Sequence, residues 1–184
     1  MLKKAILIFS GVLLVLSMAC AFFTGQLWSE IHPEFYELRD DMMVEREVFP
    51  AENLIGTVLF RPKKATAMGP EDFLARDALD HVKNETILKH QLKRLLLAKR
   101  LSWASSEDQL LITWLSTVYL GGGEYGLETA AKSLFGKSID EMTEQESIAI
   151  AALVMAPSRY RQDKQAWELR QKLLMEKLSD NSQQ

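Results

Sequence analysis

The feature that most restricts the fold is an uncharged apolar segment near the N-terminus, Ala5 to Phe23. Its 19 residues reach the about 17–25 that a helix needs to cross a bilayer. Lys3 and Lys4 precede the segment, and an acidic stretch follows it. Because positively charged flanks stay in the cytoplasm, the pattern predicts a single-pass helix in the plasma (inner) membrane. Residues 24–184 would then form an extracytoplasmic C-terminal domain.

A cleaved signal segment is an alternative to this anchor, because Ala19-Cys20-Ala21 resembles a small-residue cleavage site. A lipoprotein is disfavoured, since Leu16 lies one position too far from Cys20 for a good lipidation box. A buried structural helix fits poorly with the terminal position and the flanking lysines. The anchor is the favoured interpretation, and all three export interpretations place residues 24–184 outside the cytoplasm.

Length and composition limit the number of domains and the kinds of partner and metal site. A chain of 184 residues is long enough for one domain with one sizeable core. The net charge of -3 gives no electrostatic reason to expect a nucleic-acid partner. The single cysteine excludes an intrachain disulfide and a cysteine metal site, and the three histidines lack metal-ligand spacing. We therefore expect neither a metal nor a cofactor.

Residues 24–69 are weakly patterned and are expected to form a linker and an N-terminal part of the domain. The stretch "HPEFYELRDDMM" predicts a short helix with Pro33 in its first turn. The apolar run "NLIGTVLFRP" predicts a strand that ends at Pro62. The stretch "RPKKATAMGP", residues 61–70, is typical of a loop.

From Pro70 to the C-terminus the hydrophobic spacing is helical, so residues 70–184 are expected to form a helical domain and the chain to be mostly α. Ser105 with Asp108 and Thr143 with Glu146 have the spacing of capping boxes at helix starts. Gly136 is placed to end a helix. The expected helices cover residues 70–82, 85–101, 105–120, 125–135, about 144–156 and 163–178.

Four glycines interrupt this helical pattern in "VYLGGGEYGLETAAKSLFGK", residues 118–137. A P-loop requires a strand before its glycines and a Lys-Ser/Thr pair after them. Here a helical pattern precedes the glycines and no such pair follows Gly126. A dinucleotide fingerprint fails for the same lack of a strand. The stretch therefore predicts a tight bend that lines a cleft, with Glu128 on the first turn of the next helix.

Two blocks in this region resemble the family 51 glycosyltransferases, the peptidoglycan-polymerising domains of bifunctional penicillin-binding proteins and of monofunctional transglycosylases. "TVYLGGGEYGLETAAKSLFGK" and "MTEQESIAIAALVMAPSRY" match the family blocks "YLN-x-VYFG-x-G-x-YGIE-x-AA-x-x-YFGK" and "LT-x-x-E-x-A-x-L-A-x-L-P-x-APS-x-Y" in order and spacing. The resemblance is close over residues 118–160 and looser back to Glu85. It implies a lysozyme-like helical fold with one N-terminal membrane helix, and a lipid-linked disaccharide-peptide as substrate.

The sequence departs from the family where the resemblance assigns chemistry. The family base is a glutamate in an "ED-x-x-F-x-x-H-x-G" motif, which deprotonates a sugar hydroxyl. Glu71-Asp72-Phe73 is the nearest match, but its spacing is wrong and it lies too close to the later motifs. The donor-holding segment "GGSTITQQ" is absent. No catalytic residue is assigned for these reasons.

Further acidic positions of the family are also changed. The second functional glutamate, in "RK-x-x-E", aligns with Arg94, which remains protonated and cannot act as a base. In "E-x-Y-L-N" the glutamate and asparagine positions hold Ile112 and Ser116. Glu128, in "YGLE", is retained.

Four residues are predicted to bind substrate, each with a structural alternative. Lys93 and Arg94 could grip a pyrophosphate or an acidic lipid head group, or form part of a solvated basic face. Tyr125 could line a groove or only pack. Glu128 could contact substrate as its family counterpart does, or only satisfy backbone donors at a helix start.

Three other residues have competing interpretations. Glu124 is a weaker candidate for an unconventional general acid. Trp103 and Trp114 are predicted to be core or membrane-facing aromatics, and Arg159 is expected to pair with a carboxylate.

Three functions remain open. The first is a degenerate, membrane-anchored glycosyltransferase-like protein of cell-wall synthesis that binds lipid-linked precursor, glycan or a synthase partner. The second is an active, divergent peptidoglycan glycosyltransferase or a lytic enzyme. The third is a purely structural envelope interaction subunit. The missing motifs favour the first function over the second, and the sequence barely separates the first from the third. Enzymatic activity is therefore an open alternative.

Overall fold

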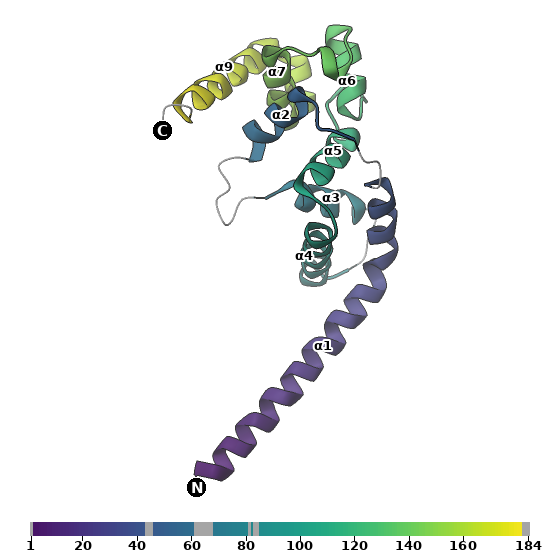
Figure 1. The fold of residues 1–184 in the computed structure, drawn as a ribbon, viewed down its shortest axis with the longest axis vertical. Helices are drawn as coiled ribbons and strands as arrows, with labels where there is room; N and C mark the ends of the chain where they lie inside the picture. The colour runs from purple at the N-terminus through teal and green to yellow at the C-terminus, as the bar shows by residue number, and fades with distance from the viewer. Residues whose placement is uncertain (1, 43–45, 61–67, 81, 83–84, 182–184) are drawn as a thin grey trace.

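The computed structural model describes residues 2–42, 46–60, 68–80, 82 and 85–181, and these are almost entirely helical (Figure 1). The one extended pairing among them is an isolated bridge between Tyr119 and Tyr125. The predicted mostly α fold with a long apolar N-terminal helix is thus confirmed. In chain order the elements are α1 (Leu2–Asp41), α2 (Pro50–Phe60), α3 (Pro70–Ala78), α4 (Ile87–Ala104), α5 (Glu107–Thr117), α6 (Leu127–Phe135), a 3-10 turn (Ile139–Glu141), α7 (Glu144–Val154), α8 (Pro157–Gln162) and α9 (Lys164–Asn181).

Helix α1 is one continuous helix of 40 residues, which corrects the prediction of a separate short helix over "HPEFYELRDDMM" with Pro33 in its first turn. Pro33 lies inside α1, where its missing N–H leaves the carbonyl of Ser29 without its usual intrahelical donor. The Nδ1 atom of His32 lies 3.1 Å from that carbonyl oxygen. The ring thus offers a local partner that helps the helix to continue through the proline.

The two ends of α1 have different surroundings. Its N-terminal part projects away from the rest of the molecule (Figure 1), and apolar side chains such as Leu13 and Phe22 are 61% and 69% exposed. Further along, Leu27, Ile31 and Phe35 are buried in the core. By length and composition, the stretch Leu13–Asp41 of α1 is long and apolar enough to cross a membrane. The same helix therefore joins an apolar, uncovered segment to the folded body.

Helix α2 corrects the predicted strand at residues 53–62. Pro50 suits a first helical turn, and the carboxylate of Glu52 accepts a hydrogen bond from the backbone N–H of Phe49 at 2.9 Å. Ala51 and Ile55 bury one face of α2 in the core. This packing overrides the strand preference of the β-branched residues in the run. The predicted loop at 61–70 lies mostly outside the described residues.

Local capping sets the ends of the middle helices. Helix α3 begins at Pro70 as predicted, and the N–H of Gly69 donates to Oδ2 of Asp72 at 3.0 Å. Helix α5 begins at Glu107, two residues after the predicted start, because Ser106 and Gln109 form its capping box and not the predicted Ser105 and Asp108. Ser105 is used instead to end α4, and its N–H donates to the carbonyl of Leu101 at 3.1 Å.

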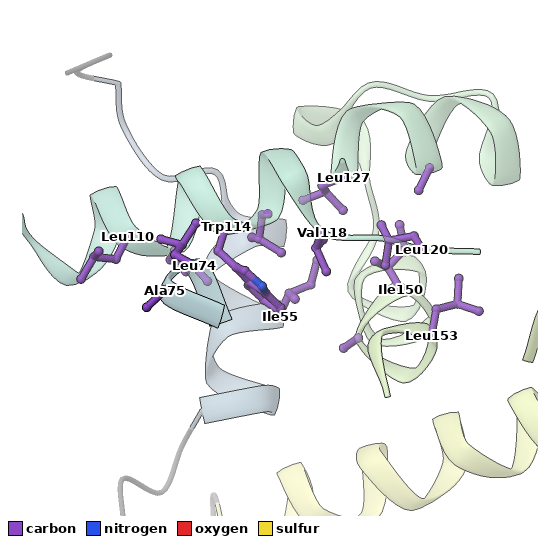
Figure 2. Packing of buried hydrophobic residues seen from close by; sticks show 14 of the residues in the cluster. Ile55, Leu74, Ala75, Leu110, Trp114, Val118, Leu120, Leu127, Ile150 and Leu153 are labelled. Carbon is purple, nitrogen blue, oxygen red and sulfur yellow. The ribbon is translucent and has the colours of Figure 1, made fainter. Parts of the chain in front are cut away.

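One apolar core joins these helices. Trp114 of α5 is only 1% exposed, and its ring lies 5.2 Å from that of Phe60 and 5.5 Å from that of Phe73, between centroids. Figure 2 shows this part of the core, with Ile55 and Leu74 beside Trp114. The predicted core alternative for Trp114 is confirmed, whereas Trp103 is 68% exposed.

The C-terminal helices follow the prediction closely, with one addition. Thr143 and Glu146 form the predicted capping box of α7, and Gly136 ends α6 in the left-handed conformation with φ 68°. The short α8 after Ala156 was not predicted. Helix α9 packs on α7, and the indole N–H of Trp167 donates to the carbonyl of Ala149 at 2.8 Å.

Candidate substrate-binding region

The glycine stretch forms a small hairpin between α5 and α6. The N–H of Leu120 donates to the carbonyl of Glu124 at 3.0 Å, and the N–H of Gly126 donates to the carbonyl of Val118 at 2.9 Å. Val118 and Leu120 are buried, and Figure 2 shows them in the cluster that includes residues of α7. The predicted tight bend is confirmed. Helix α5, and not a strand, precedes it, which agrees with the argument that this stretch is not a P-loop.

Two of the hairpin glycines have no room for a side chain. A Cβ on Gly126 would lie 2.5 Å from the carbonyl oxygen of Ser116, and one on Gly121 would lie 2.8 Å from that of Pro157. Their φ angles are 85° and 88°, which other residues rarely adopt. Glycine is therefore required by both sterics and backbone conformation at these positions, and the hairpin is fixed against α5 and α8.

Glu124, the weaker candidate for a general acid, forms an ion pair with Arg161 of α8. The same guanidinium donates from Nε to the carbonyl of Leu120 at 3.1 Å. Arg161 therefore ties the hairpin to α8 and holds the Glu124 carboxylate in a structural role. It is Arg161, two residues beyond the predicted Arg159, that pairs with a carboxylate here.

Glu128 lies on the first turn of α6, as predicted. Its Oε1 lies 2.8 Å from Nζ of Lys132, and its Oε2 accepts a hydrogen bond from the N–H of Ile139 at 3.3 Å. Its side chain is 46% exposed, so a ligand could still reach it. Tyr125 is 61% exposed, and its ring packs at a tilt of 47° against that of Tyr119, with 5.1 Å between the ring centroids. Both residues thus combine a structural contact with an accessible surface.

Lys93 on α4 is buried and holds two carboxylates. Its Nζ lies 2.5 Å from Oε1 of Glu85 and 2.7 Å from Oε2 of Glu30 on α1. Burial alone would lower the pKa of Lys93, but the hydrogen bonds to Glu30 and Glu85 outweigh it and the pKa is raised. The hydrogen bond from Lys93 is also the main reason that the pKa of Glu85 is lowered. Lys93 therefore joins α4 to α1 as a permanent cation.

Arg94 differs from its neighbour. It is half-buried, and its Nε is buried without a hydrogen-bond partner among the described residues. A buried guanidinium N–H without an acceptor is costly. The Nε of Arg94 is thus a donor for which the described part of the chain supplies no acceptor.

The four predicted binding residues fall into two groups. Lys93 and Arg94 lie on α4, whereas Tyr125 and Glu128 lie at the start of α6. Helix α5 packs on both α4 and α6 and lies between them in Figure 1. The structure thus brings together the members of each pair but does not join the two pairs in one contact cluster. The predicted cleft at the glycine bend stays a prediction.

A second buried ionic group could not be predicted from the sequence. Glu52 is 1% exposed, and the guanidinium of Arg46 donates to both of its oxygens, at 2.5 and 2.7 Å. The main cause of the raised pKa of Arg46 is this hydrogen bond to Glu52, and the charge of Glu128 also contributes. The spacing of Arg46 and Glu52 carried no recognisable signal. In the described residues no cluster of three His, Cys, Asp or Glu side chains could hold a metal.

Comparison with known proteins agrees with the motif pattern. Residues 74–179, more than half of the chain, match the family model described as Transglycosylase. The chain therefore belongs to this family, as the two sequence blocks predicted. It is 38% identical over 81 residues to penicillin-binding protein 1A of Rickettsia bellii and 37% identical over 76 residues to that of Escherichia coli.

These alignments cover only part of each protein. They include 44% of this chain and 10% of the Rickettsia bellii protein, and 41% and 9% for the Escherichia coli protein. Penicillin-binding protein 1A of Aquifex aeolicus shows the same pattern, with 36% identity over 76 residues. The chain thus matches about a tenth of the length of these relatives.

Proposed function

We propose that this chain is a membrane-anchored, peptidoglycan glycosyltransferase-like protein of cell-wall synthesis that binds without polymerising. Its ligand would be lipid-linked precursor, glycan or a cell-wall synthase. Residues 1–23 would be the anchor and residues 70–184 the transglycosylase-like domain, outside the cytoplasm. The observation that carries the proposal is the substitution of Arg94 at the family's acidic position, together with the missing base motif.

The acids near the retained family block support an impaired enzyme. Glu124 is paired with Arg161 and Glu128 with Lys132, and Arg94 stands where the resemblance places the family's second carboxylate. A positioned base contributes roughly 10²–10⁴-fold to the rate of such a displacement. Because Arg94 cannot accept a proton at neutral pH, it cannot supply the rate acceleration of a general base.

Anion binding is the property that Arg94 can supply. Its side chain is only half-buried, and a guanidinium forms charge-assisted hydrogen bonds with phosphate oxygens. Lys93 is predicted to contribute charge rather than a direct bond, since its Nζ already contacts Glu30 and Glu85. Tyr125 and Glu128 remain predicted contacts to a glycan.

The test uses the purified full chain in nanodiscs with the pyrophosphate-linked disaccharide-peptide lipid. We expect no glycan strands from the wild type or from Arg94→Glu. We expect binding that weakens with salt and becomes about tenfold weaker in Arg94→Ala, the loss of one charge-assisted hydrogen bond. Arg76→Ala is the matched control, because Arg76 is exposed and paired with Asp77.

Other results of this experiment would support one of the two alternative functions. Glycan strands made by the wild type and abolished by Glu128→Gln or Glu71→Gln would show a divergent polymerase. Neither polymerisation nor precursor binding would favour a structural envelope subunit. Equal binding by Arg94→Ala and Arg76→Ala would remove Arg94 from the site.

A further inference from the structure

Helix α4 carries an apolar face that no described part of the chain covers. Ile87, Leu88, Leu95 and Trp103 are 82%, 71%, 57% and 68% exposed. Leu88, Leu95, Lys99 and Trp103 are seven, four and four residues apart, so they share one side of the helix. Exposed leucines at single positions are common, but a row of large apolar side chains on one helix face marks an interaction surface.

The contacts between α4 and α1 show how the two helices cross. Lys89 and Lys93 contact Glu30, and the guanidinium of Arg100 lies 4.8 Å from the ring centroid of Trp28. From Lys89 to Arg100 α4 advances about 16 Å, whereas from Trp28 to Glu30 α1 advances only about 3 Å. The two helices therefore cross steeply. In Figure 1 α4 is seen nearly end-on while α1 runs along the picture.

This crossing lies at a defined height on α1. Trp28 follows Phe23, the end of the uncharged segment, by five residues or about 8 Å. The polar layer on each side of a bilayer is about 5–7 Å thick. If α1 crosses the membrane up to Phe23, the crossing with α4 thus lies at the outer edge of the head-group layer, within reach of the side chains of α4. Figure 1 shows α4 as the body helix nearest the projecting part of α1, with α3 and α5 beyond it.

The side chains of α4 suit such a location. Nζ of Lys99 lies 5.2 Å from the ring centroid of Trp103, and the guanidinium of Arg100 lies 5.9 Å from it. Tryptophan is enriched at membrane interfaces, and lysine and arginine extend their charges to the head groups while their carbon chains stay in apolar surroundings. The negative charge of Glu30 at this level is balanced by two lysines.

We propose that α4 lies flat on the outer membrane surface of the bilayer that α1 crosses, with Leu88, Leu95 and Trp103 in the interfacial lipid. The occupant of the uncovered face is thus lipid rather than another protein. This inference rests on the anchoring of α1 in the proposed function. Its consequence is that α1 and α4 together fix the orientation of the body, as a perpendicular pair does better than one flexible anchor.

The test measures where nitroxide labels lie in nanodiscs that hold the full chain and no other protein. Cys20 is the sole cysteine and reports on α1 in the wild type. Leu95→Cys and Leu169→Cys are labelled in a Cys20→Ser background. Leu169 on α9 is the matched control, because it is a leucine of similar exposure, 60%, on a helix far from the projecting end of α1 (Figure 1).

We expect labels at positions 20 and 95 to collide with oxygen several-fold more, relative to a water-soluble nickel chelate, than the label at position 169. Lipid-like collisions at 20 with water-like collisions at 95 would overturn the α4 proposal and leave the anchor intact. Water-like collisions at 20 would overturn both. As a label-free check, brominated lipids should quench the native chain more than Trp103→Phe, and equal quenching would contradict the proposal.

Discussion

The hairpin block, residues 118–160, and helix α4 belong to the same family match but use their residues differently. In the block, backbone hydrogen bonds and glycines without room for a Cβ fix the chain between α5, α6 and α8. In α4, leucines such as Leu97 and Leu101 still face the core, but the charged side chains differ from the family pattern. Lys93 joins α4 to α1, and Arg94 stands where the resemblance expects an acid.

The comparison separates two kinds of constraint. Gly121 and Gly126 of the hairpin can only be glycines, because a Cβ at either position would meet backbone atoms that cannot move aside. A charged side chain on one face of a helix can be replaced while the helix persists, because most residue types adopt the helical backbone conformation. The fold can thus survive after a residue that performs chemistry has been replaced.

The largest expected effect tests the rigidity of the hairpin. Gly126→Ala places a Cβ against the Ser116 carbonyl at φ 85° and ψ 144°, a region nearly restricted to glycine. We expect a loss of about 3 kcal/mol in the free energy of unfolding, measured by denaturant unfolding of the full chain. Gly122→Ala is the control, because open space surrounds that position, and it should cost about 1 kcal/mol. Equal losses would mean that the block is not sterically fixed.

The second prediction tests whether α4 is held by its charges. Lys93→Met leaves Glu85 and Glu30 without their shared buried cation. Because both carboxylates keep some access to water, we expect a loss of about 2 kcal/mol, below the range for fully buried pairs. Lys132→Met breaks the exposed pair with Glu128 and should change stability by about 0.5 kcal/mol or less. A smaller loss for Lys93→Met than for Lys132→Met would contradict the role of Lys93 as a link between helices.

The sequence predicted features that depend on near neighbours in the chain. Gly136 at the end of α6 and the Thr143–Glu146 capping box act within one helical turn. The glycine bend could be predicted because only a turn accommodates such spacing. By contrast, α2 becomes helical through burial of Ile55 against distant elements, and the strand preference of its sequence was misleading.

The candidate site was less predictable for the same reason. The contact between Lys93 and Glu30 joins residues far apart in the sequence, and no spacing rule links them. Arg161 rather than Arg159 reaches a carboxylate, since the short α8 turns the side chains of that segment. The family motifs identified Glu128 and Arg94, but they could not indicate that α5 lies between the two helices that carry them.

The smallest expected effect concerns the charge at the start of α7, where the family block continues after the hairpin. Hydrogen bonds from Lys137 and from the backbone N–H of Thr143 lower the pKa of Glu146 to about 2, with Nζ of Lys137 2.8 Å from Oε1. A carboxylate whose pKa is lowered on folding stabilises the native state above the unfolded pKa, 4.5, and loses this effect as the pH falls toward 2.

Glu146→Gln isolates that charge, because glutamine at this position still completes a capping box. We expect it to lower the free energy of unfolding by about 1 kcal/mol at pH 7, and the difference from the wild type to shrink between about pH 5 and pH 2. Glu144→Gln, in the same helical turn, should cost no more than about 0.5 kcal/mol, because it removes only an interaction with the helix dipole. A difference for Glu146→Gln that stays constant down to pH 2 would show that the amide disturbs the cap itself. Hydrogen-bond geometry, and not charge, would then stabilise the start of α7 in the hairpin block. The hairpin block would differ even more clearly from α4, which is joined to α1 by charged side chains.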